Sequence, residues 1–311
     1  MNGILIIDKP AGLTSHDAVM RVRRALRVRR VGHTGTLDPL ATGVLVILVG
    51  QATRLAQFLA GAVKEYEAII RLGFATETGD LAGAEIAATR RRVDCATWSD
   101  AEIAAALASL RGPSDQTPPM YSAKKVRGRK LYELARRGIE VERAPARVMV
   151  YELEARRREG ALLHPGPDGT CDLAVRVVCS AGTYVRALAE RLGERLGTGA
   201  HLASLRRTRA GDFHLADAVS LARLETMAAA GQAATLLLPL GAALSAMPFL
   251  HLNADEARQA QHGAALHPPP VSVEWKDGDH VKLCDGDGRL IAVGVYDCER
   301  RLLRPRIVFG P

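Results

Sequence analysis

The sequence lacks the patterns that hold metal ions and nucleotide cofactors. No group of histidines and cysteines has the spacing of a zinc site, and no two cysteines form a CxxC pair. No Walker P-loop occurs, and no GxGxxG run follows a strand-like segment. These absences argue against a metal-dependent nuclease or deaminase and against an enzyme with a nucleotide cofactor. We therefore expect a protein that uses neither a metal nor a cofactor.

Cysteines are few, and long apolar runs are missing. The five cysteines, an odd number in 311 residues, are scattered from position 95 to position 298. Their number and spacing predict neither a disulfide framework nor a zinc site, and they favour a reducing cytoplasm. Charged residues interrupt every apolar run before it reaches the length of a membrane span, and the N-terminus lacks the basic region of a signal peptide. We expect a cytoplasmic protein without membrane contacts.

Aromatic residues are also few, whereas positive charge is in excess. Five Phe, six Tyr and two Trp leave few side chains that could stack on an unpaired base. By contrast, 42 Lys and Arg against 34 Asp and Glu give a net charge of +8. Such an excess favours a polyanionic partner, although many basic proteins bind none. The length and the hydrophobic fraction of 48% suffice for one large domain and a smaller one.

Hydrophobic periodicity predicts a mixed body of helices and strands. Thr14 or Ser15 begins a helix that has Asp17 at the capping-box spacing from Thr14, and Ser99 begins another with Glu102 at the same spacing. Strands are predicted at 4–7, 44–49, 66–72, 148–154 and 172–179, further helices at 131–137 and from about 185 to 196, and a hairpin loop at 160–169.

These elements favour an α+β fold with long, mainly antiparallel strands over a regular series of βαβ units. The apolar, proline-containing segment 236–250 is interpreted as a domain junction. Beyond it, a short helix at 254–262 precedes strand-like pieces separated by Asp-Gly pairs, which are hairpin signals. The last sixty or so residues are therefore expected to form a small β-rich module.

The most informative segment is the run GHTGTLDPLATG at 32–43, here called the signature loop. It is too irregular for a helix or a strand, and the apolar strand 44–49 follows at once. A loop on a rigid strand is a common place for catalytic groups. Asp38 lies between Leu37 and Pro39, and Pro39 favours an extended backbone at Asp38. An isolated Asp-Pro pair is most often a structural turn, so the whole loop carries the functional interpretation.

Together with further segments in the same order, the signature loop resembles the TruB-type tRNA pseudouridine synthases over about residues 3–215. The resemblance implies the pseudouridine synthase fold, a mainly antiparallel bent sheet flanked by helices, followed by a PUA-like RNA-binding module. The matching segments are Asp8–Gly12 with Ser15, Lys64–Tyr66, Thr76–Gly83, Pro118–Lys125, Cys179–Arg186, Gly199–Leu202 and Leu205–Arg207.

The resemblance assigns catalysis to three residues. Asp38 matches the essential aspartate and would act as nucleophile or base. Arg186 would form a bidentate pair with Asp38 and hold it ionised. Tyr66 would stack on the extruded uracil and move its C5 proton. On pattern alone, Tyr66 at the head of a strand is better explained as a core aromatic, and Arg186 as a solvated helix charge.

Further residues are expected to bind the substrate. By resemblance, Tyr184 and Leu205 line the base pocket, His33 supports the extruded RNA conformation, and Lys9 with Pro10 buttresses the signature loop. The residue types alone also allow His33 to be a turn histidine.

The densest basic run, 124–130, matches the RNA-gripping insertion of the family and is expected to contact phosphates. A charge run is otherwise usually a solvated face. Lys124 stands where the family more usually has an apolar residue, which leaves open which lysine meets the RNA. The residues expected to bind are Lys125, Arg127, Arg129 and Lys130.

The implied function is isomerisation of uridine 55 in the T loop of tRNA to pseudouridine by base flipping, glycosidic bond cleavage and reattachment through C5. The implied domains are a catalytic domain at 1–245, with the insertion at about 120–148, and the PUA-like module at 250–311. We expect a monomer that binds the T arm of tRNA without a guide RNA. The reaction is redox-neutral, so no cofactor is needed.

Two other functions remain open at this stage. A non-catalytic RNA-binding or RNA-remodelling protein would account for the charge, but not for Asp38, Tyr66 and Arg186. A guide-directed synthase acting on ribosomal RNA would carry the same segments, usually with long lysine-rich tails. This chain begins at the first predicted strand and ends at Pro311, which favours the stand-alone enzyme.

Overall fold

A computed structural model describes residues 1–126, 128–268 and 275–310. Within them, an 11-stranded sheet forms the large domain, in the order β13-β1-β3-β11-β4-β10-β8-β5, with β2, β9 and β12 paired beside this path. The strands are β1 (Gly3–Lys9), β2 (Val31–His33), β3 (Thr42–Val49), β4 (Lys64–Leu72), β5 (Gly112–Gln116), β8 (Ala146–Ala155), β9 (Leu163–Pro165), β10 (Cys171–Cys179), β11 (Ala200–Ala210), β12 (Phe213–His214) and β13 (Val219–Ser220).

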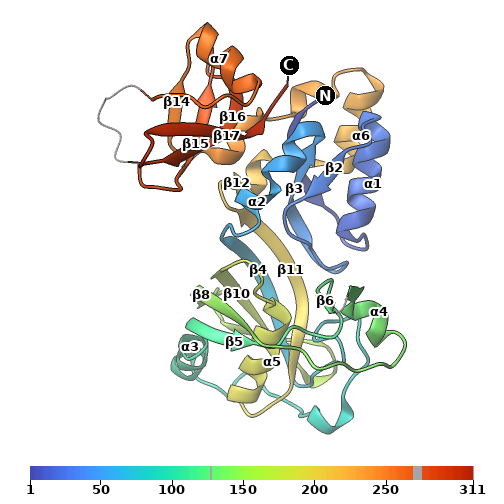
Figure 1. Ribbon diagram of the computed structural model, residues 1–311. Coiled ribbons are helices and arrows are strands. Elements are labelled where there is room, and N and C mark those ends of the chain that lie inside the picture. The colour runs from blue at the N-terminus through green and yellow to red at the C-terminus, as the bar shows by residue number, and fades with distance from the viewer. Residues whose placement is uncertain (127, 269–274, 311) are drawn as a thin grey trace.

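Most neighbouring strands of this sheet are antiparallel, as predicted. Strands β4 and β11 cross the middle of the molecule in Figure 1, between the half with β1 and β3 and the half with β8 and β10. The ladder of these two strands shifts register twice, between Leu202 and Ser204 and between Arg207 and Arg209. Such bulges bend a strand and increase its twist. The bent sheet expected from the resemblance is therefore present.

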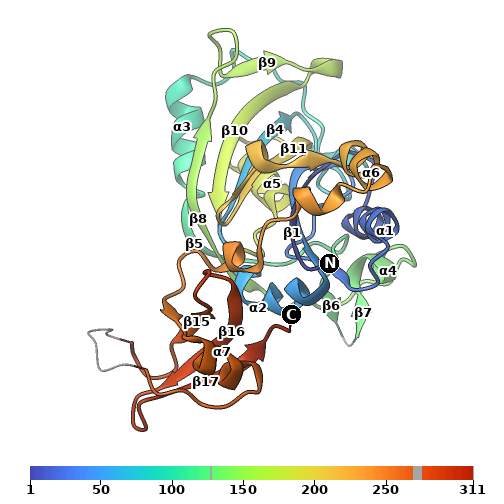
Figure 2. The same ribbon diagram turned by 90° about the horizontal axis from the view of Figure 1, so that it is seen from above.

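Helices cover the sheet, and their beginnings follow the local sequence. Thr14 caps α1 and Ser99 caps α3, each with the predicted capping box to Asp17 and Glu102. Figure 2 shows α1 beside α6 on one side of the molecule and α3 along the β8 edge. The helices of the large domain are α1 (Ser15–Leu26), α2 (Ala56–Leu59), α3 (Asp100–Ala108), α4 (Leu131–Ala135), α5 (Val185–Arg195) and α6 (Leu221–Ala229).

The C-terminal module is a separate four-stranded sheet, in the order β14-β15-β16-β17, packed against α7. The Asp-Gly pairs at 285–288 form the turn between β15 and β16, as predicted. The pair at 277–278 is a turn ahead of β15. The elements are β14 (Phe249–His251), α7 (Ala254–Gln261), β15 (His280–Cys284), β16 (Leu290–Asp297) and β17 (Leu302–Val308).

Two expectations from the sequence were wrong. Cys95 and Cys171 form a disulfide, although the cysteine spacing predicted none. The pairing joins the segment before α3 to the start of β10 across 76 residues, so no local pattern indicated it. The segment 160–169 is also more than a hairpin loop, because β9 inside it pairs with the start of β10.

No helix in the described ranges is long and apolar enough to cross a membrane.

Strands β3 and β11 meet in parallel at a single point, where Arg206 lies opposite Thr42 and Arg207 opposite Gly43. Gly43 has a φ of +98°, which side chains other than glycine rarely adopt. A Cβ atom added there would lie 2.2 Å from the carbonyl oxygen of Arg207. The last glycine of the signature loop therefore allows β3 and β11 to come together.

Candidate active site

A cavity of about 350 Å³ lies where the signature loop meets β4, β11 and the beginning of α5. Its wall includes Asp38, Tyr66, Tyr184, Arg186 and Leu205, the five residues that the sequence placed at or around the base. They come from four separate stretches of the chain. The fold therefore brings together the residues expected at the centre of the site.

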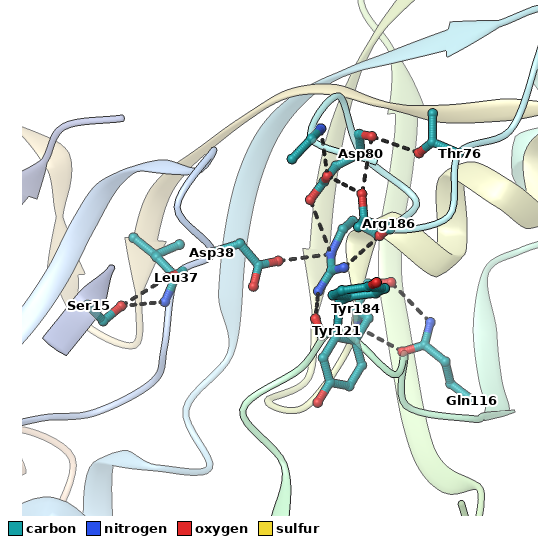
Figure 3. Close-up of polar contacts among 11 residues, drawn as sticks. Ser15, Leu37, Asp38, Thr76, Asp80, Gln116, Tyr121, Tyr184 and Arg186 are labelled. Carbon is teal, nitrogen blue, oxygen red and sulfur yellow. Dashed lines mark hydrogen bonds and ion pairs between the residues drawn. The ribbon is translucent and has the colours of Figure 1, made fainter. Parts of the chain in front are cut away.

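The signature loop is held from behind by β1 and α1. Ser15, the first residue of α1, accepts a hydrogen bond from the backbone of Leu37 (2.8 Å) and donates one to its carbonyl (3.0 Å) (Figure 3). Lys9, fully buried at the end of β1, donates to the carbonyls of Pro10 and Leu13 and lies 3.5 Å from that of Pro39. Ser15 thus fixes the backbone before Asp38, and the backbone N–H of Gly12 holds the carbonyl of Pro39 after it (2.9 Å), beside the longer contact from Lys9.

Asp38 is paired with Arg186, but through one pair of atoms. Arg186 Nε lies 2.9 Å from Asp38 Oδ2 (Figure 3). The two terminal nitrogens of Arg186 donate to the carbonyls of Thr78 (2.6 Å) and Tyr121 (2.7 Å). The predicted bidentate pair is therefore wrong, because both terminal nitrogens donate to backbone carbonyls and neither donates a hydrogen bond to Asp38. Arg186 is 4% exposed in its side chain, which excludes a solvated helix charge.

A second carboxylate stands on the far side of Arg186. Asp80 Oδ2 lies 3.8 Å from Arg186 Nε, and its other oxygen accepts from Thr78 and from the backbone of Ala82 (Figure 3). One buried guanidinium therefore faces two carboxylates and two carbonyls. Such a set of contacts fixes the position of Arg186 and, through it, of the Asp38 carboxylate. Sequence reasoning matched the segment 76–83 but did not single out Asp80.

Burial raises the pKa of the Asp38 carboxyl above its usual value, and Asp80 adds to this effect. The Arg186 and Lys9 charges oppose it. A carboxylate of raised pKa is a stronger base than one of ordinary pKa. The geometry therefore offers one oriented carboxylate at the cavity wall for attack or proton transfer.

Tyr66 and Leu205 share the face of the sheet that borders the cavity. Tyr66 pairs with Arg207 across the β4–β11 ladder, and Leu205 pairs with Ala68. Tyr66 is 7% exposed, and burial raises the pKa of its phenol, while the Arg207 charge lowers it. Its burial fits a core aromatic, yet its ring also lines the cavity, so both interpretations from the sequence describe part of its position.

Tyr184 is placed by a reciprocal pair of hydrogen bonds. The Gln116 side chain accepts from the Tyr184 backbone N–H (2.7 Å) and donates to its carbonyl (3.1 Å) (Figure 3). Tyr184 directly precedes α5, and Arg186 is the second residue of that helix. The two hydrogen bonds therefore also fix the backbone next to Arg186. Gln116, the last residue of β5, thereby positions Tyr184 in the cavity wall.

The remaining predicted binding residues that the structure describes are not part of the cavity wall. His33 is on β2, half-buried, and burial lowers the pKa of its imidazole. Lys125 on β6 (Lys125–Val126) and Arg129 on β7 (Arg129–Lys130) are exposed on a two-stranded hairpin. Lys124, just before this hairpin, lines the cavity. Arg127 lies outside the described residues. Among those described, no group of His, Cys, Asp and Glu could hold a metal ion.

Two buried cations of the site were missed by sequence reasoning. Lys64 (4% exposed) and Arg207 (1% exposed) both line the cavity. Lys64 is two residues before Tyr66 on β4, so the period of a strand places both side chains on one face. That spacing was the available signal, since both residues lie in segments that had been matched.

Comparison with known proteins places this site in an enzyme class. The model of the "TruB family pseudouridylate synthase (N terminal domain)" matches residues 23–185, and that of the "tRNA pseudouridylate synthase B C-terminal domain" matches residues 186–245. The chain therefore belongs to the TruB family of pseudouridylate synthases, which are isomerases.

Curated relatives in this family carry a more particular name. The chain is 49% identical over 274 residues to "tRNA pseudouridine synthase B" of Geobacillus thermodenitrificans, covering 88% of each chain. It is 40% identical over 306 residues to the protein of the same name from Bacillus subtilis, covering 98% of this chain and 96% of the relative.

Solved structures have the same fold. The chain superposes on a chain of a "Cbf5-Nop10-Gar1 Complex" with a TM-score of 0.73 and 27% identity, covering 99% of this chain and 85% of that chain. It superposes on one from an "H/ACA RNP bound to a substrate RNA containing 2'-deoxyuridine" with a TM-score of 0.72 and 26% identity, at the same coverage. The pseudouridine synthase fold expected from the sequence is therefore confirmed.

Proposed function

We propose that the protein converts uridine 55 in the T loop of tRNA to pseudouridine. The observation that carries the proposal is the Asp38–Arg186 ion pair in the wall of a cavity that also contains Tyr66. The names of the curated relatives support tRNA as the substrate. We further propose that the protein acts in the cytoplasm as a monomer, without a guide RNA.

The chemistry needs groups that this site contains. The N1–C1′ bond of uridine breaks, a C5–C1′ bond forms, C5 loses its proton and N1 gains one, so the reaction is redox-neutral. Because a base in a stacked helix is out of reach, the uridine must be extruded into the cavity. Asp38, oriented by Arg186, attacks the nucleotide or takes a proton from it. Tyr66 stacks on the uracil in place of its lost neighbours, and its hydroxyl relays the C5 proton: the phenol gives its own proton to water as it takes the one from C5.

The C-terminal sheet with α7 is proposed to be a PUA-like RNA-binding module at 250–311. The catalytic domain would then span 1–245. The hairpin of β6 and β7 lies within the proposed insertion at about 120–148, and its exposed cations suit it to hold RNA phosphates while the cavity receives the base.

A product assay tests the proposed function. The purified protein is incubated with an unmodified T-arm stem-loop, without guide RNA or added metal, and pseudouridine is measured. We expect conversion at the target uridine, and none in a stem-loop with cytidine at that position. Absence of product with the first RNA contradicts the proposal. Conversion only after a guide RNA is added would instead place the protein with the guide-directed synthases.

As the pH is lowered, activity should be lost at a higher pH than the pKa of an ordinary aspartate would predict. The proposed step needs the Asp38 carboxylate, and burial raises the pKa of this group. As pH falls through that raised value the carboxylate is protonated, so kcat/KM falls. The measurement is the pH profile of kcat/KM on the T-arm stem-loop. An acid limb at or below the ordinary aspartate value of about 4 contradicts the assignment.

Neutralising the hairpin should weaken RNA binding more than chemistry. We expect replacement of Lys125, Arg129 and Lys130 by Gln to raise the Kd for tRNA and to lower its salt dependence by about 0.9 in slope for each lost phosphate contact. The single-turnover rate at saturating RNA should change much less. The measurements are titrations at several salt concentrations and a rapid-quench time course.

A matched control removes three charges elsewhere. Arg156, Arg157 and Arg158 are exposed in the turn that follows β8, and Figure 2 shows β8 and β9 meeting far from β6 and β7. Replacing these three by Gln changes the net charge equally. If both triple variants have the same Kd and salt slope, the hairpin is only a solvated surface.

A further inference from the structure

Three cations are buried around the cavity without a carboxylate of their own. Lys9, Lys64 and Arg207 are 0%, 4% and 1% exposed. Among the described residues none of them is within ion-pair distance of an acidic group. A buried charge is costly unless other groups satisfy it. The hydrogen-bond acceptors of each cation therefore indicate its role.

Two of the three are satisfied by the protein itself. Lys9 Nζ contacts three carbonyl oxygens, two of them within 2.8 Å. Arg207 donates Nε to the carbonyl of Val44 (2.7 Å) and its terminal nitrogens to those of Gly35 (3.1 Å) and Thr36 (3.4 Å). These side chains use their donors on backbone of β3 and of the loops around the site. Their role is to hold that backbone in place.

Lys64 differs from both. Within the described part of the chain its ammonium makes one hydrogen bond, to the carbonyl of Ala62 at 2.9 Å. An ammonium has three donors, so two are left. Lys64 lines the cavity, and a Cβ atom at Gly35 would lie 3.6 Å from its Cε. Gly35 therefore lies beside the Lys64 side chain at the cavity wall.

The surroundings of Lys64 favour an incoming anion. Burial lowers its pKa to about 8, and the Arg207 charge from β11 acts in the same direction. Cys179 of β10, opposite Lys64 in the ladder, opposes this shift. The ammonium is still the main form at pH 7. Asp38 faces Arg186 at 2.9 Å, so the nearby catalytic carboxylate is already engaged.

We propose that Lys64 binds a phosphate oxygen next to the uridine that enters the cavity. The inference deepens the proposed function and rests on it. A uridine carries no charge on its base or sugar, so the negative charge that it brings to this site is on its two flanking phosphates. Two free donors on a buried cation at the cavity wall suit a phosphate oxygen. Lys64 would thereby fix the depth to which the nucleotide enters.

The test compares Lys64→Met with the wild-type protein on three RNAs. Each is a T-arm stem-loop that already has pseudouridine at the target position, so no reaction occurs during binding. In one RNA the linkages are natural, and in the others an uncharged methylphosphonate replaces the phosphate on the 5′ or the 3′ side of that nucleotide. The measurement is the Kd as a function of salt concentration.

We expect Lys64→Met to raise the Kd for the natural RNA about tenfold or more, and to lower the salt slope by about 0.7–0.9. One of the two methylphosphonate RNAs should bind the wild-type protein as weakly as the natural RNA binds Lys64→Met. The same RNA should bind Lys64→Met with no further loss. The conservative variant Lys64→Arg should retain the salt slope.

Other variants separate binding from a structural role. Lys64→Met removes the cost of burying a charge and leaves only the carbonyl of Ala62 without its donor, so the melting temperature should stay close to that of the wild-type protein. Lys9→Met should lower it, because carbonyls are left without a donor. Arg111→Gln removes one exposed charge at the end of α3 and should leave the Kd unchanged.

Two outcomes overturn the inference while wild-type product formation still supports the proposed function. The first is Lys64→Met binding all three RNAs as the wild-type protein does. The second is an equal loss of affinity on the charged and uncharged linkages, which would mean that Lys64 contacts the base or acts through Tyr66. Failure of the wild-type product assay contradicts the proposed function instead.

Discussion

Asp38→Asn is expected to lose turnover to near the uncatalysed background while RNA binding persists. Asn keeps the shape of the side chain and removes the charge and the proposed nucleophile or base. Binding should survive, because it depends mainly on phosphate contacts with cations elsewhere. Loss of kcat at unchanged Kd is the signature of a group that acts on the transition state. Single-turnover rates and Kd on the T-arm stem-loop measure the two quantities.

Folding has to be checked in this variant, because it leaves Arg186 without its nearer carboxylate. Arg186 retains the carbonyls of Thr78 and Tyr121 and the more distant Asp80, so we expect the fold to remain. The melting temperature and the circular dichroism spectrum test this. Asp115→Asn, an exposed carboxylate on β5, is the matched control and should keep full activity. If Asp38→Asn retains more than about a few per cent of the wild-type rate, the mechanism is wrong.

Tyr66→Phe should bind RNA nearly normally and turn over very slowly. Phe keeps the aromatic face and removes the hydroxyl, which is proposed to receive the C5 proton. Burial keeps this phenol protonated at pH 7, so it must give up its own proton as it takes the one from C5, and the neighbouring Arg207 charge favours that loss. A stalled variant would accumulate a nucleotide that is joined through C5 but still holds its proton. Rates and a trap for this intermediate are the measurements.

Tyr66→Leu separates stacking from proton transfer. Leu loses the ring as well, so binding should weaken by about 1–3 kcal/mol, the usual contribution of one stacked base. The same two substitutions at Tyr151, which is exposed on β8, are the controls and should change neither quantity. Turnover of Tyr66→Phe near the wild-type rate would refute the proton-transfer role. Full activity of Tyr66→Leu would remove Tyr66 from the site.

Features set by near neighbours in the chain were predictable from the sequence. The cap of α1 depends on residues three apart, Thr14 and Asp17, and appears as expected. The signature loop stood out because its glycines and its Asp-Pro pair disfavour regular structure, and residues 34–41 lie outside helices and strands as expected. Its ends were misjudged, because Gly32 and His33 belong to β2 and Thr42 and Gly43 to β3. The core strands were visible as apolar runs, and the turn at 285–288 as two Asp-Gly pairs.

What the sequence did not reveal depends on segments that meet only after folding. The Cys95–Cys171 disulfide needs β10 to lie beside the loop before α3. The Arg186 pair was expected to be bidentate, because no local pattern shows that the carbonyls of Thr78 and Tyr121 compete for its terminal nitrogens. Lys64 was matched only as part of the segment Lys64–Tyr66, and its burial was not predicted, since that burial is set by its neighbours on β10 and β11.

The close approach at Gly43 links the two walls of the site. Strand β3 carries the loop with Asp38, and β11 carries Leu205 and Arg207, and their backbones touch where Gly43 has no side chain. A larger residue there would push β3 and β11 apart, and with them Asp38 and Leu205, while every proposed functional group remained in the chain. A sequence search that scores only the reactive residues would therefore classify such a protein as an active enzyme. A homologue with another residue at this position is therefore a candidate pseudoenzyme.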